Sequence, residues 1–311
     1  MSKTTLIITT RDRPDYLKRA VESALNQTRP FDKIIISDNS SSLAVKHKNK
    51  ALLTPYLNQN KNLMRLIPTP VNFPSDNHTK YIQDNYIENV GFCVLFHDDD
   101  ELLPNYHETA IAAIKSSNDI VAVGCNAFKL RESISVSGTI MGHNKGLKII
   151  QTKRELLTYY MEIGPTSPPP LCGYFFRANV LKSIPFTSTI GGKYSDVVAL
   201  SEATEFGKII WIYEPLLRYR THLSQSSRSV STLDFRSLFN YMLRDGGFVL
   251  GSIQVESYRF KHMRLKLTEL VKSNRWRSSR TVVCFLTGFA LRKLIWRWQT
   301  YGHLWKLLRR K

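Results

Sequence analysis

The N-terminal part of the chain contains two short apolar runs separated by one amphipathic helical pattern. Residues 5–10 (TLIITT) and 33–37 (KIIIS) are rich in β-branched residues, which favours buried strands. Between them, Pro14 suits the first turn of a helix, and Leu17 and Val21 repeat at helical spacing. A strand, a helix and a second strand within about 35 residues form a β–α–β unit, which requires a parallel sheet.

The alternation of strand and helix patterns continues along the chain. The predicted strands are 92–96 (FCVLF), 119–130 and 208–213 (KIIWIY), and the predicted helices are 81–89 and 105–115. Glu108 stands three residues after Asn105, which predicts a capping box at the start of the second helix. The pattern as a whole predicts an α/β fold with a parallel sheet covered by helices.

Positive charge is concentrated near the C-terminus. The net charge is +19, and residues 225–311 hold eighteen Lys and Arg against four acidic residues, a net +14. The same region becomes helical in pattern after a serine-rich stretch at 224–231. We therefore expect an α/β domain over residues 1–224 and a basic helical region over residues 225–311.

The cysteine pattern and the apolar segments indicate a cytoplasmic protein. The four cysteines, which form no CxxC pair, are Cys93, Cys125, Cys172 and Cys284. Three lie among apolar residues, which is typical of reduced, packed thiols rather than of a structural zinc site. The N-terminus lacks a signal-peptide pattern, and the apolar stretch 281–291 is about half a membrane span. We expect no spanning helix.

Three adjacent carboxylates, Asp98, Asp99 and Asp100, follow the predicted strand 92–96. They repel one another unless a cation or water screens them. The carboxyl edge of a parallel sheet is where α/β folds bind ligands. Oxygen ligands of this kind suit Mg²⁺ or Mn²⁺, together with substrate phosphates. The alternative interpretation is a solvated acidic turn that caps the next helix.

Asp38 ends the predicted strand 33–37 in the same way. Alone, it is typical of a turn in which the side chain bonds the backbone. Together with Asp98, it predicts a cleft at one edge of the sheet. Such a cleft would hold a base and ribose at one strand end and phosphates at the other.

Three segments resemble the inverting family 2 glycosyltransferases, which have the GT-A fold. In order, they are LIITTRDRPDYLKRAVESALNQT, KIIISDNSS and FCVLFHDDDELLP, and the resemblance covers roughly residues 4–224. It implies a Rossmann-like mixed, mostly parallel sheet flanked by helices. It also implies transfer of a sugar with inversion from a nucleotide-sugar donor, most commonly a UDP-sugar.

The resemblance also implies a set of site residues. The implied donor-binding residues are Thr9, Thr10, Arg11, Arg13, Asp38, Asp98 and Arg220, and the implied ligands of Mn²⁺ or Mg²⁺ are Asp99, Asp100 and His222. Asp38 carries over as the aspartate that typically meets the pyrimidine base. His97 stands where the first aspartate of the family's DxD motif often stands, so the resemblance leaves open which of the three aspartates contacts the ion.

The family's general base is usually the aspartate of a Glu-Asp pair that opens a helix. Here Ser195 replaces the glutamate, and Asp196 carries over as the group that takes the proton of the acceptor hydroxyl. An ordinary N-cap for a helix from Val197 is the alternative. Arg220 and His222 lie in a segment, EPLLRYRTH, that resembles the end of the family's domain. Arg220 would stabilise the leaving diphosphate, or is a surface arginine.

The basic tail interleaves tryptophan with Arg and Lys over residues 275–298, along a broad apolar helical face. This pattern is typical of helices at anionic membrane surfaces. Many family members use glycan or lipid-linked acceptors. We therefore expect a role in bacterial surface polysaccharide synthesis, such as lipopolysaccharide O-antigen, on the inner face of the plasma membrane. A packed helical subdomain or an oligomer contact is the alternative.

Two other function classes fit the sequence less well. A nucleic-acid-binding protein would use the basic aromatic tail, but the chain has no recognised nucleic-acid motif and its charge is separate from the α/β part. A nucleotidyltransferase on a similar sheet usually has a glycine-rich phosphate loop near its N-terminus, and residues 9–14 contain no glycine.

Overall fold

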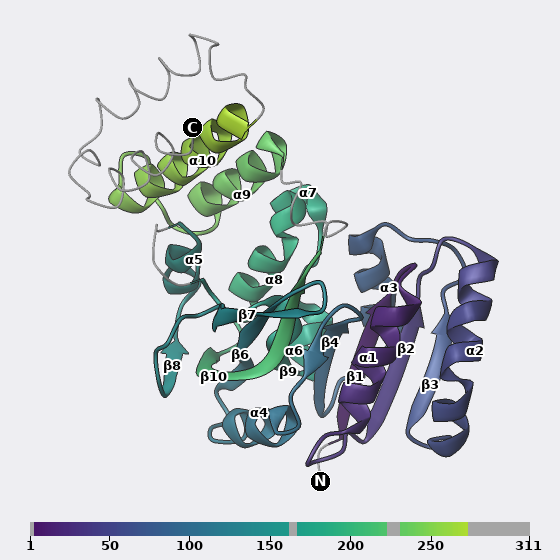
Figure 1. The fold of residues 1–311 in the computed structure, drawn as a ribbon. Helices are drawn as coiled ribbons and strands as arrows, with labels where there is room; N and C mark the ends of the chain where they lie inside the picture. Colours follow the sequence, from purple (N-terminus) through teal and green to yellow (C-terminus); the bar gives the residue numbers. More distant parts are fainter. Residues whose placement is uncertain (1–2, 162–166, 223–230, 273–311) are drawn as a thin grey trace. The chain divides into compact units, whose positions relative to one another are not determined.

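The computed structural model describes residues 3–161, 167–222 and 231–272 (Figure 1). The chain divides into two compact units, Met1–Leu156 with Thr166–Leu238 and Leu157–Pro165 with Phe239–Lys311. The expected boundary at residue 224 stays a prediction, because residues 223–230 lie outside the described part. Among the helices described, none is long and apolar enough to cross a bilayer.

The elements alternate as the sequence pattern predicts. The strands are β1 (Thr4–Thr10), β2 (Lys33–Asp38), β3 (Met64–Pro68), β4 (Phe92–His97), β5 (Glu101–Leu102), β6 (Ile120–Arg131), β7 (Ile134–Thr139), β8 (Leu147–Ile150), β9 (Tyr174–Arg177) and β10 (Lys208–Thr221). The helices are α1 (Pro14–Leu25), α2 (Leu43–Gln59), α3 (Ser75–Tyr86), α4 (Tyr106–Ile114), α5 (Lys153–Met161), α6 (Ala178–Ser183), α7 (Ser188–Gly191), α8 (Ser195–Ala203), α9 (Thr232–Arg244) and α10 (Ile253–Lys272), with 3₁₀ turns at η1 (Leu171–Gly173) and η2 (Gly192–Tyr194).

The ten described strands form one mixed sheet. Strands β3, β2, β1 and β4 run parallel to one another, and β6 pairs in parallel with β10. Strand β9 runs antiparallel between β4 and β6, and the short strands β5, β7 and β8 add antiparallel pairs. The predicted α/β fold with a mixed, mostly parallel sheet is confirmed. Its parallel part places the carboxyl ends of β2, β1 and β4 side by side.

Helices cover both faces of this sheet (Figure 1). Consecutive strand residues point to opposite faces, yet Leu6, Ile7 and Ile8 are all fully buried. Apolar residues of α1, α2 and α4 share one core with Leu6 and Ile8. Helices α3 and α6 lie outside this core and are joined by Gln83, whose Nε2 donates to the carbonyl oxygens of Leu181 (2.7 Å) and Ile184 (2.8 Å).

Two local predictions at helix starts are wrong. Helix α3 begins at Ser75 rather than at residue 81, because its polar first turns carry no apolar repeat in the sequence. The capping box of α4 does not form. Asn105 instead donates to Glu214 Oε1 at 3.1 Å, and Glu108 accepts from Thr28 Oγ1 at 3.0 Å. Long-range partners therefore replace the local cap.

Strand β10 is longer than the predicted run 208–213 and continues to Thr221. The register against β6 shifts on both sides of Pro215, which is the signature of a bulge. A bulge lets a strand accept a proline that would otherwise end it. The extension matters because it carries Arg220 to the sheet edge and ends just before His222.

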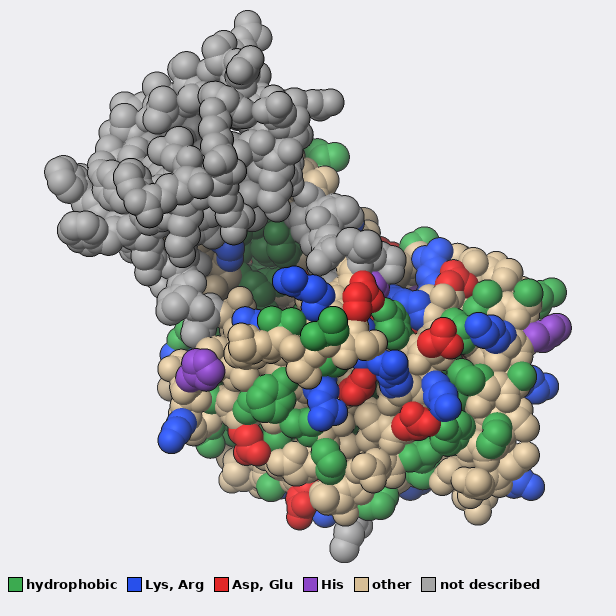
Figure 2. Space-filling model, viewed as in Figure 1, with side chains coloured by type: hydrophobic (Ala, Val, Ile, Leu, Met, Phe, Trp, Pro, Cys, Tyr) green, Lys and Arg blue, Asp and Glu red, His purple; other side chains and the backbone are tan. Residues whose placement is uncertain are grey.

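The described part of the second unit is helical, in line with the pattern of the tail. The rings of Phe239 and Tyr258 stack with centroids 6.2 Å apart, and Lys261 Nζ donates to the Tyr160 carbonyl at 3.1 Å. Residues 275–311, for which we predict a membrane-binding face, lie outside the described residues. On the face shown in Figure 2, acidic and basic side chains of the described part are interspersed rather than gathered.

Candidate active site at the strand ends

The ends of β2, β1 and β4 meet at one edge of the sheet. Thr10 pairs with Asp38, and Thr9 pairs with His97. Backbone hydrogen bonds continue past the strands, from Asn39 N to Thr10 O (2.9 Å) and from Asp98 N to Thr9 O (3.1 Å). The structure therefore brings the predicted residues Thr9, Thr10, Asp38 and Asp98 to one place.

Asp98 is buried and held by the end of β1. Its Oδ2 accepts hydrogen bonds from Thr10 Oγ1 at 2.7 Å and from Arg11 N at 3.3 Å, and Arg13 Nη1 lies 3.3 Å from Oδ1. Burial, opposed by the charge of Arg13, raises the pKa of Asp98 to about 7. The side chain is thus fixed by protein groups on both oxygens.

The turn between β1 and α1 is built around Asp12, which has a positive φ of 60°. Asp tolerates this left-handed conformation better than most residues, because its short side chain bonds nearby backbone. Here Asp12 Oδ1 accepts from Ser41 N at 2.8 Å, and Asp12 N donates to Ser40 Oγ at 3.2 Å. The turn is therefore tied to the residues that follow β2, and it directs Arg13 back toward the aspartates.

Asp99 is the acidic residue most surrounded by cationic and imidazole groups. Arg13 Nη1 and His222 Nε2 both contact its Oδ2, the latter at 2.9 Å. Burial works against the charged form, but His97, Arg13 and His222 outweigh it and lower the pKa of Asp99. Asp99 is therefore an ionised carboxylate inside a nearly closed environment.

Asp100 is buried, and only one of its two carboxylate oxygens accepts an ordinary hydrogen bond from a described residue. Its Oδ1 accepts a 2.8 Å hydrogen bond from Arg220 N, and the Cys172 thiol interacts with the same carboxyl, while Oδ2 meets no donor at ordinary hydrogen-bond geometry among the described residues. Burial and the neighbouring charge of Asp99 raise the pKa of Asp100 well above its ordinary value. An unsatisfied buried carboxylate oxygen is costly, so this atom is free to accept a bond from a further group such as a cation.

Arg220, predicted to contact the donor, is buried, and its guanidinium is bonded within the protein. Nε donates to the backbone oxygen of Asp99 at 2.8 Å, and the two terminal nitrogens contact Glu132 O and the Glu101 carboxylate. The guanidinium carbon of Arg220 lies over the Tyr16 ring, 4.9 Å from the ring centroid. In this structure Arg220 holds the turn that carries Asp99 and Asp100.

His97 is the one member of this cluster that the predicted ligand set missed. Ligand atoms of His97, Asp99 and Asp100 all lie within 4.8 Å of one another. Burial lowers the pKa of His97, which favours the neutral imidazole that binds metals. The signal was present in the sequence, because His97 occupies the place of the family's first aspartate.

Asp38 is held at the end of β2 by two donors. Its Oδ1 accepts from Ser40 N and its Oδ2 from Asn49 Nδ2, both at 3.0 Å. On α3, His78 Nε2 lies 2.8 Å from Ser37 Oγ, and burial lowers the pKa of His78 to about 4. Sequence reasoning missed Asn49 and His78, because nothing in the chain order indicates that α2 and α3 reach this edge.

The segment after β3 closes the same edge. Asn39 exchanges two hydrogen bonds with the backbone of Phe73, at 2.9 and 2.8 Å. Asn72 accepts a 2.9 Å bond from Arg11 Nη2. Arg11, predicted to bind the donor, is therefore anchored at an exposed position beside Asp38.

Asp196 lies in the first turn of α8. Burial raises the pKa of its carboxyl to about 6. Its Oδ1 accepts the backbone N–H of the next residue, Val197, at 2.8 Å. The group is thus ionised near neutral pH while retaining basicity above that of an ordinary aspartate.

The sequence matches the family model "Glycosyl transferase family 2" over residues 5–168, more than half of the chain. The chain belongs to glycosyl transferase family 2. The match covers the strand ends of β1, β2 and β4, and it does not reach the end of β10 with Arg220 and His222 or helix α8 with Asp196. Curated proteins give no sequence match to the chain.

Solved structures show that this family 2 glycosyltransferase has the GT-A fold. A fragment of S. aureus TarS in complex with UDP-GlcNAc superposes with a TM-score of 0.58 at 12% identity, covering 92% of this chain and 81% of that one. The mannosyltransferase PcManGT from Pyrobaculum calidifontis, solved with GDP-Man and Mn²⁺, gives a TM-score of 0.53 at 12% identity, covering 99% and 85%.

The residues of this family 2 chain fit a divalent cation. One imidazole and two carboxylates supply a donor set that suits Mn²⁺, and Asp100 Oδ2 is a buried acceptor that meets no donor at ordinary hydrogen-bond geometry among the described residues. His222, also predicted as a ligand, contacts the same oxygen of Asp99 that Arg13 contacts. The acidic turn is therefore not the solvated helix cap considered as the alternative.

Proposed function

We propose that the chain transfers a sugar, with inversion at the anomeric carbon, from a nucleotide-sugar donor to a glycan or lipid-linked acceptor. The observation that carries this proposal is the convergence of His97, Asp99 and Asp100 within 4.8 Å at the sheet edge of a family 2 chain. The complexes of TarS with UDP-GlcNAc and of PcManGT with GDP-Man and Mn²⁺ support it.

The nucleoside of the donor would lie at the ends of β2 and β1. Asp38 presents a carboxylate whose direction is fixed by Ser40 N and Asn49, which suits recognition of a base edge. Thr9 and Thr10 line the neighbouring strand end, and Arg11 is anchored beside it. We propose a UDP-sugar as the donor, because the resemblance favours it.

The diphosphate would lie over the turn of Asp98–Asp100. Bound there, Mn²⁺ or Mg²⁺ supplies positive charge that stabilises the departing diphosphate. His97, Asp99 and Asp100 would hold the ion, with His222 as the further candidate ligand. Arg13 adds a guanidinium at the same place, and Arg220 serves the donor indirectly by fixing the turn.

Asp196 would act as the general base. With a pKa of about 6 it is mostly ionised at neutral pH and still basic enough to accept a proton. As the acceptor oxygen attacks the anomeric carbon, its proton passes to the Asp196 carboxylate. The bond from that carbon to the diphosphate oxygen breaks in the same displacement, so no covalent sugar–enzyme intermediate is required.

The acceptor and cellular setting follow from the resemblance and the charge pattern. We propose surface polysaccharide synthesis, such as lipopolysaccharide O-antigen, by a cytoplasmic enzyme that is peripheral on the plasma membrane. Residues 275–311 would contact the anionic lipid. Deleting them should abolish binding to vesicles that contain an anionic phospholipid, and unchanged binding would refute this part.

A donor panel tests the proposed activity. The purified chain with Mn²⁺ is incubated with UDP-, GDP-, CDP- and dTDP-sugars, and released nucleoside diphosphate is measured. We expect slow hydrolysis of one nucleotide class, which stops when EDTA removes the metal. Failure to turn over any of the four classes contradicts the proposal.

A further inference from the structure

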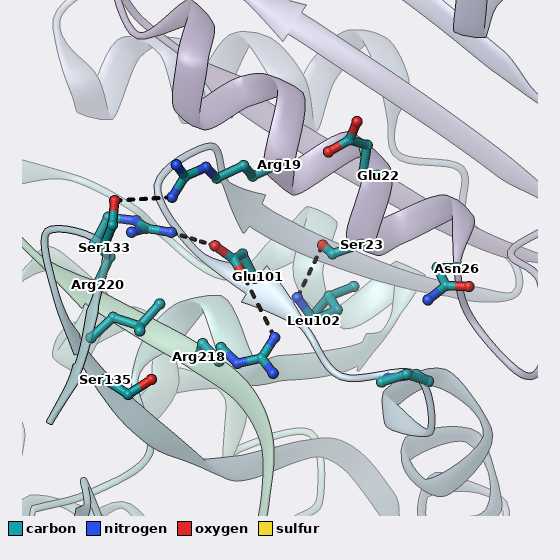
Figure 3. A pocket seen from close by; sticks show the side chains of 12 residues that line it. Arg19, Glu22, Ser23, Asn26, Glu101, Leu102, Ser133, Ser135, Arg218 and Arg220 are labelled. Atoms are coloured by element: carbon teal, nitrogen blue, oxygen red, sulfur yellow. Dashed lines mark hydrogen bonds and ion pairs between the residues drawn. The ribbon is translucent and has the colours of Figure 1, made fainter. Parts of the chain in front are cut away.

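We call the turn of Asp98–Asp100 the aspartate turn. A cavity of about 800 Å³ opens on its α1 side (Figure 3). Its α1 wall is one helical face, formed by Arg19, Glu22, Ser23 and Asn26 at positions i, i+3, i+4 and i+7. None of Thr10, Asp38, Asp98 or Asp99 lines it. We call this cavity the α1 pocket, and it is separate from the proposed donor site.

The α1 pocket holds more positive charge than its carboxylates neutralise. Arg218 and Arg220 both point at Glu101 and share its carboxylate, and the Arg218 contact is long at 3.5 Å (Figure 3). Arg19 donates to Ser133 Oγ at 3.1 Å, a neutral partner. The other carboxylate, Glu22, accepts from Tyr56 on α2. The two carboxylates Glu22 and Glu101 thus face three guanidinium groups, which leaves one positive charge in excess.

We propose that the α1 pocket binds a sugar phosphate, with the phosphate between Arg19 and Arg218. Guanidinium groups bind phosphate oxygens through paired, charge-assisted hydrogen bonds. The cavity is larger than an inorganic anion needs and falls in the size range of small-ligand sites. Ser133, Ser135 and Asn26 supply the donors and acceptors that sugar hydroxyls require.

The pocket is joined to the aspartate turn through Arg220. An anion that takes Arg218 leaves the Glu101 carboxylate to Arg220 alone. Arg220 in turn bonds the Asp99 carbonyl and, through its backbone N–H, the Asp100 carboxylate. Ligand in the pocket therefore stabilises the turn and tightens Mn²⁺ binding, and Mn²⁺ tightens ligand binding by the same factor. This coupling, unlike the binding itself, rests on the proposed function.

Calorimetric titration with glucose 1-phosphate, in EDTA so that no metal is present, tests the binding. We expect saturable binding that weakens at least tenfold in Arg19→Gln and in Arg218→Gln. The control Arg65→Gln removes an exposed arginine on β3 and should bind as the unaltered chain does. Excess UDP should not displace the ligand. Circular dichroism and thermal unfolding establish that all variants are folded.

Three outcomes overturn the proposal: no saturable binding, equal binding by both pocket variants, or displacement by UDP. The coupling is then measured by comparing the Mn²⁺ affinity with and without glucose 1-phosphate. Equal affinities in the two conditions would show that the pocket and the metal site are not coupled. If the chain binds no Mn²⁺ in either condition, the proposed metal site is refuted. The titration in EDTA contains no metal, so it still tests ligand binding to the α1 pocket.

Discussion

His222 Nε2 lies 2.9 Å from Asp99 Oδ2, which joins the end of the last strand of the sheet to the turn after β4. The two residues are 123 positions apart in the chain. Two further contacts reinforce the link, because Arg220 holds the backbone of Asp99 and the carboxylate of Asp100. The aspartate turn is thus shaped by β10 as much as by its own strand.

Arg13 contacts the oxygen of Asp99 that the proposed cation would take. Arg13→Gln removes the guanidinium that contacts Asp98 and Asp99, so the metal-free protein should be less stable. Without nucleotide, the variant should bind Mn²⁺ several-fold more tightly, up to about tenfold or ~1.4 kcal/mol. Calorimetry and thermal unfolding in EDTA measure both effects. Weaker or unchanged Mn²⁺ binding would show that Arg13 does not occupy the cation's place.

Asp100→Asn should change stability and metal binding in opposite directions. The buried carboxyl has one oxygen that meets no donor at ordinary hydrogen-bond geometry among the described residues, and an amide of the same shape carries no charge to bury. The metal-free variant should therefore unfold at the same or a higher temperature, while its Mn²⁺ affinity falls at least tenfold. A variant that is less stable and binds Mn²⁺ normally would indicate a purely structural role.

As the proposed general base, Asp196 should set the low-pH limb of the reaction. The base acts in its ionised form, and burial raises its pKa to about 6. Below that pH, kcat/KM should fall about tenfold per unit, and it should level off above it. Asp196→Asn should lose at least about a hundredfold in transfer and keep its donor affinity within about twofold. Full activity in this variant would contradict the base assignment.

His78 makes stability depend on pH. Its pKa is about 4 in the folded chain and about 6.5 when unfolded, so between these values only the unfolded state gains the proton. Stability is therefore complete above about pH 6.5 and declines as the pH falls toward 4, by at most about 3 kcal/mol. His78→Gln cannot titrate, so denaturant unfolding at pH 7 and pH 4.5 should show a smaller loss. An equal loss would exclude His78 as the cause.

The sequence predicted the parts of the site that come from local patterns. Strands β1, β2 and β4 are short β-branched or apolar runs, and their parallel order places Asp38 and Asp98 at one edge. His97 was missed as a ligand because an imidazole replaces the expected carboxylate. His97 occupies the motif position where an aspartate was expected, and it lies beside Asp99 and Asp100, but it offers an imidazole nitrogen rather than a carboxylate oxygen.

Features that depend on distant partners could not be predicted. Asn49 on α2 and His78 on α3 reach the edge only through tertiary packing. The bulge at Pro215 lets β10 continue beyond the predicted run 208–213. Arg220 became a support of the turn because its partners, Glu101 and Glu132, come from other elements. Spacing along the chain contains none of this information.

We propose that the ends of β2, β1 and β4 form one site for a cation and a diphosphate. Calorimetric titration of UDP and of GDP, each with and without Mn²⁺, tests it on the unaltered chain, on Asp99→Asn and on the surface control Asp84→Asn. Asp84 is an exposed residue of α3, and within the described part of the chain its carboxylate pairs with Lys80. We predict that one nucleotide binds only with Mn²⁺, equally in the control and at least tenfold more weakly in Asp99→Asn. Nucleotide binding that does not depend on Mn²⁺, or that is equally tight in Asp99→Asn, would contradict a shared site for the cation and the diphosphate.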